Sequence, residues 1–441
     1  MVLVIVAHNN PGPHDSADRG SEAPRSPHYD IAVIGAGAAG LATAIFAAAR
    51  ASGVRVVLFD GARQPGAKIL ISGGSRCNVT NAVVTERDFN GGRPAIVRRV
   101  LAAFPASKAA DYFRQLGVAL HEEPGGKLFP DSNRSRDVLE ALLRESARRG
   151  VELRAGHRVL DVANDTGMFR LTTSQGTFRA RCVVLATGGL SLPKTGSDGW
   201  GYEIAKRFGH SLVPMTPALA PLVLNGQPPT AHRELSGVSH DVRIDIRVDG
   251  AVRSRIRGAL LWTHFGISGP AALDASRHWL RAKLERSNVQ TTLSLAPDHR
   301  FESLDATFIE LAKSRPRLSV HNAVAAHVPA AVASVLLGVA DIPGPRRMAE
   351  ITREERRTVT RALVEWPLPI ADSRGYNYAE VTAGGVTLTE INPATMESRL
   401  HPGLYLVGEI LDVDGRIGGF NFQWAWSSAY VAGAALGAQR T

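Results

Sequence analysis

The chain has 441 residues and a mass of 47.1 kDa, which is room for two or three domains of ~150 residues each. Hydrophobic residues make up 44% and charged residues 21%, so the composition excludes a wholly disordered protein. The only two cysteines, Cys77 and Cys182, lie far apart, which excludes a disulfide scaffold, a CxxC redox centre and a cysteine-rich metal site. So few cysteines are typical of a cytoplasmic protein.

The net charge is +10 and the sequence pI is about 10.0, which raises the question of a nucleic-acid partner. Arginine supplies 44 of the 51 basic residues, and these residues are scattered without a run of five or six. A bias toward arginine also arises from the base composition of a genome. The charge alone therefore does not predict a nucleic-acid interface, and binding to RNA or DNA stays as an alternative.

The first 28 residues predict a flexible tail, because they are rich in Pro, Gly, Ser and Asp and have no periodic apolar face. The apolar run Val2–Ala7 lacks the basic flank and the length of a signal peptide. Two uncharged stretches, Ile31–Ala49 and Gly418–Gln439, have the length of a membrane span. Glycines interrupt the first and polar residues interrupt the second, so we predict no membrane segment.

A strand–turn–helix–strand pattern directly follows the predicted tail. Tyr29–Ile34 predicts a strand, GAGAAG follows it, and an Ala-rich helix runs to about Arg50. A second buried strand, 54–59, ends at Asp60. This spacing is typical of the parallel βαβ unit of dinucleotide-binding domains.

The glycines of this turn match the fingerprint GxGxxG in the context that gives it meaning. Gly35 permits the tight turn, Gly37 lets a pyrophosphate approach the backbone, and Gly40 allows close packing of helix on sheet. The start of the helix faces the phosphates with its free N–H groups. Asp60, 25 residues after Gly35, is placed to accept hydrogen bonds from ribose hydroxyls.

The pattern continues with amphipathic helices at 95–117 and 134–149. A strand and an antiparallel meander are predicted over 151–181, and Cys182–Ala186 is another buried strand, which leads into Gly188-Gly189.

After this point the composition changes. β-type runs fill 212–262, and alternation there places four apolar residues on one face: Val242, Ile244, Ile246 and Val248. Residues 270–286 and 300–364 have a mostly helical pattern. A buried strand at Leu404–Val407 and a helix from about Asn421 to Leu436 follow. We therefore predict a nucleotide-binding domain built from both ends of the chain, with a second domain inserted.

FAD is favoured over NAD as the dinucleotide. No second strand–GxGxxG–helix unit occurs, so the chain has no separate nicotinamide-nucleotide domain. The LYLVGE segment leads into a glycine-rich turn and a helix, as in FAD enzymes with split domains. The helix start at Gly419–Phe422 can aim backbone N–H groups at the N1–C2=O edge of a flavin.

Five long ungapped blocks resemble the bacterial BaiN-like flavoprotein family, which includes aminoacetone oxidase-type enzymes. The resemblance extends from about Tyr29 to Gly433, and the blocks are residues 67–82, 188–210, 262–271, 381–398 and 408–433. It implies an FAD-dependent, NAD(P)-linked oxidoreductase with a discontinuous FAD domain, a β-rich middle domain and a small helical insertion.

We therefore expect an α/β fold, with a Rossmann-like, glutathione-reductase-type FAD-binding domain. Its expected parts are residues 29–193 and 373–441. The β-rich substrate domain is expected at 194–372, with a helical subdomain at about 298–345.

Carried over by motif, the resemblance also implies the cofactor site. Ser72 to Asn78 would lie near the flavin, Glu409 by the ribityl chain, and Gly419 to Phe422 by the pyrimidine edge. Asp60 stands where the family usually has Glu, and Ser75 replaces a usual glycine. The expected FAD-binding residues are Gly35, Gly37, Ala38, Ala39, Gly40, Asp60, Lys68, Ser72, Gly73, Gly74, Arg76, Cys77, Asn78, Gly188, Gly189, Glu409, Asp414, Gly419, Phe420, Asn421 and Phe422.

The catalytic candidates are Lys194, in a loop able to approach flavin N5 or a substrate carbonyl, and His264, a possible proton donor. A solvated lysine and a structural histidine are the alternatives. Cys77 is more simply a buried packing residue, and Asp412 and Asp414 are turn residues rather than a metal site.

The function expected from these features is hydride transfer between flavin N5 and a small organic substrate, with transient NAD(P)H or oxygen as the other redox partner. We expect no metal and no membrane partner. The alternative is a flavoprotein that acts on or binds RNA or DNA through its basic surface.

Overall fold

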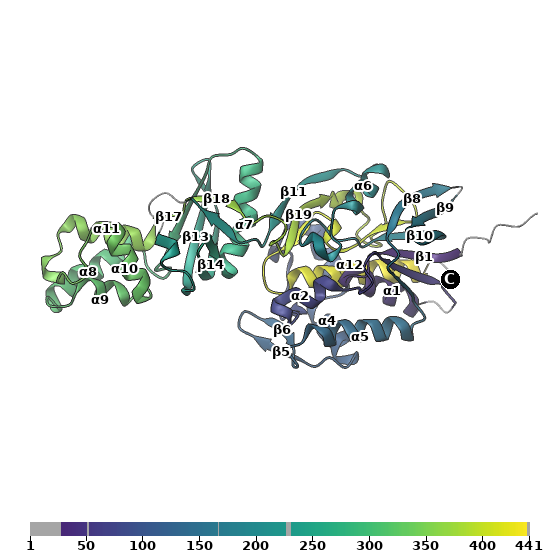
Figure 1. Cartoon of the computed structure of the whole chain (residues 1–441), viewed down its shortest axis with the longest axis horizontal. Coiled ribbons are helices and arrows are strands. Elements are labelled where there is room, and N and C mark those ends of the chain that lie inside the picture. The colour runs from purple at the N-terminus through teal and green to yellow at the C-terminus, as the bar shows by residue number, and fades with distance from the viewer. Residues whose placement is uncertain (1–27, 51–52, 166, 226–230, 439–441) are drawn as a thin grey trace, which may run out of the picture.

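The computed structural model describes residues 28–50, 53–165, 167–225 and 231–438 (Figure 1). Residues 1–27 of the expected tail lie outside this range, while His28 already belongs to the first strand. Two large hydrophobic cores divide the described chain into a first and a second body, and a small third cluster around Leu219 and Val381 lies where the chain crosses between them. In Figure 1 the first body is on the right, a sheet of the second body is in the middle, and a group of helices is on the left.

The first body is built on a seven-stranded sheet in the order β7-β2-β1-β10-β9-β8, with β20 paired to β10. The strands β7, β2, β1, β10 and β20 are parallel, whereas β8 and β9 form the antiparallel meander. Their bounds are β1 His28–Ile34, β2 Val56–Asp60, β7 Glu152–Ala155, β8 Val159–Asp165, β9 Met168–Thr173, β10 Gly176–Leu185 and β20 Leu404–Leu406. The parallel strands are apolar and almost fully buried, as expected for a sheet covered on both faces.

Helices α1 (Ala38–Arg50) and α12 (Phe420–Ala438) pack side by side against this sheet (Figure 1). Two glycines of α12 allow this helix to approach α1 closely. A Cβ added at Gly433 would lie 2.6 Å from Cβ of Phe46, and one at Gly437 would lie 2.6 Å from Cβ of Arg50. The helix that follows the phosphate turn is thus in contact with the last described helix.

The segment 95–117 is not one helix. It forms α3 (Pro94–Ala103) and α4 (Ala106–Gln115), because Pro105 has no N–H to donate and disfavours a helical conformation at Phe104. The other helices of the first body are α2 Ala67–Ser75, α5 Ser135–Arg148 and α6 Trp200–Arg207.

Three small sheets complete the first body and its junction. Their strands are β3 Thr80–Asn81 with β5 Leu120–Glu123 and β6 Lys127–Pro130, β4 Phe89–Gly91 with β21 Val413–Gly415, and β11 Leu212–Ala218 with β19 Val381–Val386. The chain passes to the second body after β11 and returns before β19, and these two strands pair antiparallel. The 3-10 helices are Glu86–Asp88, Pro193–Thr195, Ala231–Arg233, Met348–Glu350, Leu388–Glu390 and Gly408–Ile410.

The second body contains a seven-stranded sheet in the order β17-β16-β13-β14-β15-β12-β18, and α7 (Gly269–Leu284) packs on it. The strands are β12 Leu222–Leu224, β13 Ser239–Val248, β14 Ala251–Thr263, β15 Gly266–Ser268, β16 Val289–Ser294, β17 Trp366–Pro367 and β18 Ile370–Ser373. The expected apolar face of β13 is present, since Val242, Ile244 and Ile246 are fully buried and Val248 packs beside them.

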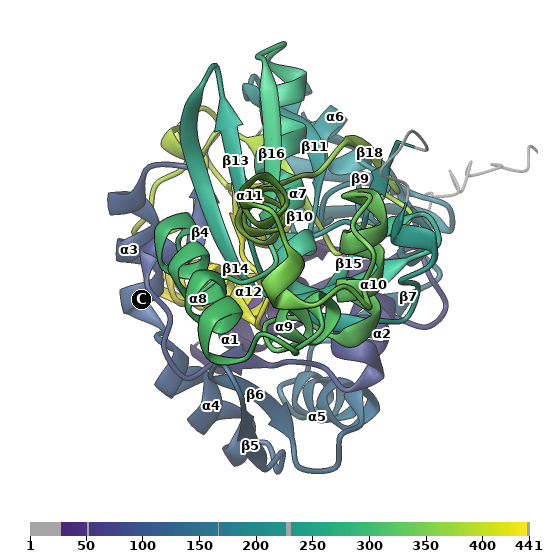
Figure 2. The ribbon, with the colours of Figure 1, turned by 90° about the vertical axis from the view of Figure 1, so that its left-hand side faces the viewer.

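The helices of the second body gather at one end of the molecule (Figures 1 and 2). They are α8 Phe301–Ser314, α9 Val320–Ala325, α10 Ala330–Val339 and α11 Arg353–Val364. Helical structure thus continues past residue 345, where we expected the helical subdomain to end. At the other boundary, Tyr202 and Ile204 of α6 pack in the first core, although we expected 194–372 to form the inserted domain. Core membership therefore places the crossing points near Leu219 and Glu380.

None of the helices within the described residues has both the length and the apolar character needed to cross a membrane. This includes α1 and α12, each of which covers part of one of the two uncharged stretches of the sequence.

Candidate functional site

A cavity of about 660 Å³ runs through the first body and is lined by residues from both ends of the chain. One end is at the phosphate turn and β2, and the other is at the α2 segment and the start of α12. Its volume lies in the range of about 300–1,000 Å³ that is typical of ligand and cofactor sites.

The phosphate turn has the geometry that a pyrophosphate requires. Gly35 has φ +102°, and a Cβ there would lie 2.5 Å from the carbonyl oxygen of Ala186. A Cβ at Gly40 would lie 1.8 Å from the Gly35 oxygen, so helix and turn touch directly. Gly37 lies on the cavity wall, and a Cβ added there would meet nothing within 4 Å. Because α1 begins at Ala38, its unpaired first-turn N–H groups are beside this open space.

Asp60 lies on the cavity wall at the end of β2. Its Oδ2 accepts a 2.8 Å hydrogen bond from the Ala36 N–H, and its Oδ1 accepts one of 2.8 Å from the Ala62 N–H. Burial raises the pKa of this carboxyl, and the two backbone hydrogen bonds lower it. Each oxygen keeps a further acceptor position for a ribose hydroxyl.

The α2 segment turns sharply where it meets the cavity. Ser72, Gly73 and Gly74 leave helical geometry inside the helix, and all three lie on the wall. Ser75 has φ +67°, a left-handed conformation that glycine adopts more easily and that accounts for the glycine usual there. Arg76 and Asn78 also lie on the wall.

Cys77 does not reach the cavity wall. Its side chain is fully buried, and burial raises the pKa of its thiol to about 12. The structure therefore places Cys77 as a neutral packing residue and not as a flavin-proximal thiolate.

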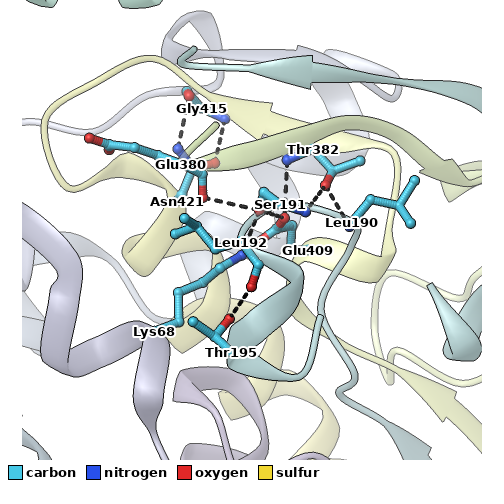
Figure 3. Close-up of polar contacts among 10 residues, drawn as sticks. All are labelled: Lys68, Leu190, Ser191, Leu192, Thr195, Glu380, Thr382, Glu409, Gly415 and Asn421. Atoms are coloured by element: carbon cyan, nitrogen blue, oxygen red, sulfur yellow. Dashed lines mark hydrogen bonds and ion pairs between the residues drawn. The ribbon is translucent and has the colours of Figure 1, made fainter. Parts of the chain in front are cut away.

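Glu409 lies on the wall, at the centre of a polar cluster (Figure 3). Its Oε2 pairs with Lys68 Nζ at 2.8 Å. Its Oε1 accepts hydrogen bonds from Ser191 Oγ at 2.8 Å and from the Thr382 N–H at 3.0 Å. Lys68 Nζ also donates to Ser191 Oγ at 2.7 Å. Protein groups thus occupy most of the hydrogen-bond acceptor positions of the Glu409 carboxylate. Only Oε2 has a position left for the ribityl hydroxyl that we expected Glu409 to bind.

The loop that precedes α12 contributes Gly418, Gly419, Asn421 and Phe422 to the wall. The Asn421 side chain fixes this loop, because its Oδ1 accepts from the Gly415 N–H at 2.8 Å and its Nδ2 donates to the Gly415 oxygen at 2.9 Å (Figure 3). The start of α12 is thus held at the cavity.

Two expected cofactor residues of this region face elsewhere. Phe420 is fully buried in the protein. Asp414 is 2% exposed, and its two oxygens accept hydrogen bonds of 2.6 and 3.0 Å from Arg277 of α7. Burial raises the pKa of Asp414 and Arg277 lowers it. The structure thus assigns Asp414 to an ion pair between the two bodies instead of to the cofactor.

Of the remaining residues predicted to bind the cofactor or to act in catalysis, some lie on the cavity wall and others lie away from it. Gly188 lies on the wall, whereas Gly189 lies behind it, where a Cβ would be 2.4 Å from Thr382 Oγ1. Lys194 is exposed and is not on the wall, although Thr195 to Ser197 are. His264 is exposed in the turn between β14 and β15, away from the cavity.

Sequence reasoning missed a group of charged residues at the α12 end of the cavity. Lys127 of β6, Glu380 before β19 and Arg416 after β21 lie on the wall. Asp274 of α7 lies next to them, since its Oδ1 accepts a 2.7 Å hydrogen bond from the Ile417 N–H. No local motif marks these residues, because they meet only through the tertiary fold.

The acids of this group are shifted toward their neutral forms. Burial, followed by Asp274, raises the pKa of Glu380, while Lys68 and Lys127 lower it. Burial raises the pKa of Asp274 to about 6. The hydrogen bond from the Ile417 N–H and the positive charges of Arg416 and Lys127 lower this pKa, but by less than burial raises it. Perturbed acids at a cavity wall are typical of functional sites.

The family profile described as "HI0933-like protein Rossmann domain" matches residues 29–435. The chain belongs to the HI0933-like family. It is 35% identical to the ribosomal RNA dihydrouridine synthase of Escherichia coli (strain K12) over 404 residues, 91% of this chain and 96% of that protein. It is 32% identical to the 3-dehydro-bile acid delta(4,6)-reductase of Clostridium scindens over 405 residues, 92% of this chain and 98% of that protein. Among solved structures, a 3-ketosteroid-delta4-(5alpha)-dehydrogenase from Rhodococcus jostii has a TM-score of 0.46 at 15% identity, covering 96% and 99% of the two chains.

This membership confirms the predicted family, the Rossmann-like α/β fold and FAD as the cofactor. The HI0933-like protein is an FAD-dependent oxidoreductase. The open space at Gly37 and the length of the cavity fit the cofactor, which supplies hydride transfer at N5 of its ring when it is bound. The chain's own part is to bind the dinucleotide and to orient it.

Proposed function

We propose that this HI0933-like protein uses reduced FAD to saturate a carbon–carbon double bond conjugated to a carbonyl, and that its substrate is a uracil base in ribosomal RNA. The observation that carries the proposal is the 35% identity to a ribosomal RNA dihydrouridine synthase over nearly the full length of both proteins. A second relative of that name, from Haemophilus influenzae, is 32% identical over 374 residues.

The names of the two relatives describe the same kind of reaction, the reduction of a carbon–carbon double bond conjugated to a carbonyl. Dihydrouridine forms when the C5=C6 bond of uracil, conjugated to the C4 carbonyl, gains a hydride and a proton. The double bonds reduced by a delta(4,6)-reductase of a 3-dehydro-bile acid are likewise conjugated to a ketone. Substrates of either kind need a flavin on one side and a proton donor on the other, and the wall at the α12 end of the cavity offers charged groups for this purpose.

The basic surface supports RNA as the substrate. Arg253, Arg255 and Arg257 alternate along β14 and are all exposed. Arg257 pairs with Asp298 and Arg255 lies 4.0 Å from Asp245, so these two would exchange a carboxylate for a phosphate, whereas no ion pair is seen for Arg253 among the described residues. Arginines on one strand can neutralise successive phosphates of a nucleic acid. The RNA-directed alternative from the sequence thus becomes the preferred proposal, in place of a free small molecule.

A small conjugated ketone is the second candidate, and the 32% identity to the bile acid reductase favours it. Apolar residues on the same part of the wall, Ile71, Phe129, Leu219 and Ile417, are suited to a hydrocarbon skeleton. For either substrate we propose NAD(P)H as the donor that reduces FAD, bound transiently at the flavin face.

The test is to delete the gene in its native organism and to measure dihydrouridine in the ribosomal RNA by nucleoside mass spectrometry. The FAD-loaded protein and NADPH or NADH are then added without oxygen to RNA from the deletion strain, or to a 3-keto-4,6-diene steroid. A loss of dihydrouridine that the protein restores supports the RNA proposal. Unchanged RNA with reduced steroid supports the second candidate, and no reaction with either contradicts both.

A further inference from the structure

Lys127 and Glu380 lie at the cavity end where the flavin ring is expected. Strand β6 pairs with β3, with Lys127 opposite Asn81. The Asn81 Nδ2 donates to the oxygens of Gly125 and Gly418 at 2.9 and 3.0 Å, so the hairpin with Lys127 is fastened to the loop before α12. On the other side, the Glu380 backbone oxygen lies 3.2 Å from Ser191 Oγ, whose single proton it shares with Glu409.

Lys127 differs from the other lysine and arginine side chains of the wall in its ion pairing. Four of these cations have carboxylate partners: Lys68 with Glu409, Arg76 with Glu123, Arg158 with Asp198 and Arg416 with Asp88. Lys127 alone makes no ion pair or hydrogen bond with its side chain inside the described ranges. Its ammonium is therefore available to a ligand in the cavity.

Glu380 is the acid that faces the same space. It lines the cavity, and in Figure 3 its side chain extends away from the Lys68–Ser191–Glu409 cluster. The charged groups that act on it are Asp274 of α7, Lys68 of α2 and Lys127 of β6. Its surroundings and the acidic neighbour favour the protonated form, and a protonated carboxyl can donate.

We infer that Lys127 and Glu380 form the substrate-activating pair of this enzyme: Lys127 binds the carbonyl oxygen of the conjugated substrate, and Glu380 donates the proton to its α-carbon. The inference rests on the proposed function for the bond that is reduced, and it extends to any conjugated carbonyl substrate. Neither residue belongs to the motifs that bind the dinucleotide.

The step balances in atoms and electrons. The β-carbon of the substrate accepts a hydride from reduced FAD, the double bond breaks, and the electron pair moves onto the carbonyl oxygen beside the Lys127 ammonium. The Glu380 O–H bond then breaks as its proton forms a C–H bond at the α-carbon. The substrate is reduced by two electrons, which reduced nicotinamide dinucleotide returns to FAD, and water reprotonates Glu380.

The test uses FAD-loaded holoenzyme in the oxidised state and 4-hydroxybenzaldehyde as probe, because its phenolate oxygen imitates the negative oxygen of the enolate that precedes protonation at the α-carbon. Flavin absorbance reports binding of a stacked phenolate as a long-wavelength band. We expect Lys127→Met to weaken binding at least tenfold and to abolish the band, whereas Lys108→Met, on the exposed side of α4, leaves both unchanged. Equal binding to wild type and Lys127→Met would overturn the role of Lys127.

Glu380 is tested in the same titration at several pH values. In the wild type, phenolate affinity falls as pH rises through the ionisation of Glu380, because two negative groups then share the site. Glu380→Gln removes this fall, and Glu380→Asp keeps it. A fall that persists in Glu380→Gln, with FAD content unchanged, would overturn the proton-donor role.

The rate of substrate reduction is the last measurement. With whichever substrate is reduced, Glu380→Gln lowers the rate by about 100-fold or more, since general acid catalysis contributes on that scale. If the probe results hold but neither RNA nor steroid is reduced, the proposed function fails while the carbonyl site stands. If a substrate is reduced at wild-type rate by both variants, the pair is excluded.

Discussion

Single residues decide whether the cavity can hold its cofactor, and the three glycines of the phosphate turn do so in different ways. Gly35 and Gly40 have no room for a Cβ because backbone oxygens lie 2.5 and 1.8 Å away, so they maintain the turn itself. Gly37 has open space before it, so a side chain there would compete only with the ligand. The sequence motif predicts all three positions, while the structure separates the folding role from the binding role.

Gly37→Val is therefore expected to abolish FAD binding while the protein stays folded. The valine side chain fills the space that the pyrophosphate needs, and its Cβ has no protein atom within 4 Å. Flavin absorbance of the purified variant and its circular dichroism melting curve measure the two effects. Gly40→Ala is the control, since its methyl group collides with Gly35 and should lower the melting temperature. Full FAD retention by Gly37→Val would show that the phosphate turn is misassigned.

Lys68 and Glu409 are expected to act as one unit. Each is partly buried, with side-chain exposures of 26% and 18%, so removal of either partner leaves the other without its opposite charge, although its hydrogen bonds to neutral groups remain. We expect Lys68→Met and Glu409→Gln each to weaken FAD binding by about 1–3 kcal/mol. The double variant should lose less than the sum of the two, because the interaction can be lost only once. Strictly additive losses in FAD titrations would mean that the pair does not couple.

Helix α7 links the second body to the cavity at the scale of whole elements. Arg277 binds Asp414 of β21, and Asp274 binds the Ile417 N–H two residues beyond that strand. Two side chains one helical turn apart thus hold the loop that leads to Gly418 and Gly419. The orientation of the second body and the position of this loop are therefore mechanically connected.

Asp274 gives this connection a pH dependence whose sign follows from its raised pKa. Its folded-state pKa of about 6 exceeds the ordinary 3.8, so the folded protein holds the proton more tightly than the unfolded chain does. The contribution of Asp274 to stability is complete below pH ~4 and is lost as pH rises to ~6. We expect Asp274→Asn to remove a difference of about 3 kcal/mol between these two pH values. Urea unfolding of both proteins at each pH measures it, and parallel pH profiles would contradict the assignment.

The elements also show what the sequence predicts and what it cannot. Strands β1, β2, β10 and β20 and helix α12 were predicted within a few residues, except that β10 begins earlier, because an apolar run or glycine turn marks each one locally. The break at Pro105 was missed because helical periodicity continues across it. Lys127 and Glu380 were missed for a different reason. Each reaches the wall through partners distant in sequence, such as Asn81 with Gly418, and no spacing encodes such contacts.

At the scale of the whole molecule, charge and shape suggest how RNA would approach. The second body extends from the first (Figure 1), and the arginines of its strand β14 are exposed. We expect the triple variant Arg253→Ala, Arg255→Ala, Arg257→Ala to weaken RNA binding and to reduce the slope of log affinity against log salt by up to about 3. Filter binding at several salt concentrations measures both quantities.

The matched control removes three exposed arginines of the first body, Arg98, Arg114 and Arg134. It changes the net charge by the same amount. Equal losses from the two triple variants would show that only total charge matters and that β14 is no docking strand.

The contact between α1 and α12 has a consequence for the order of events during synthesis. Arg50 Nη2 donates a 2.8 Å hydrogen bond to the Tyr430 hydroxyl, which is 380 residues later in the chain. A ribosome therefore completes the phosphate turn long before it makes the helix that closes the other end of the cavity. The second body has its own core, and domains with separate cores fold as units while the chain is still growing. The nascent protein would therefore carry a folded second body before it can capture flavin, so FAD is needed only once α12 has been made and not when the phosphate turn is made.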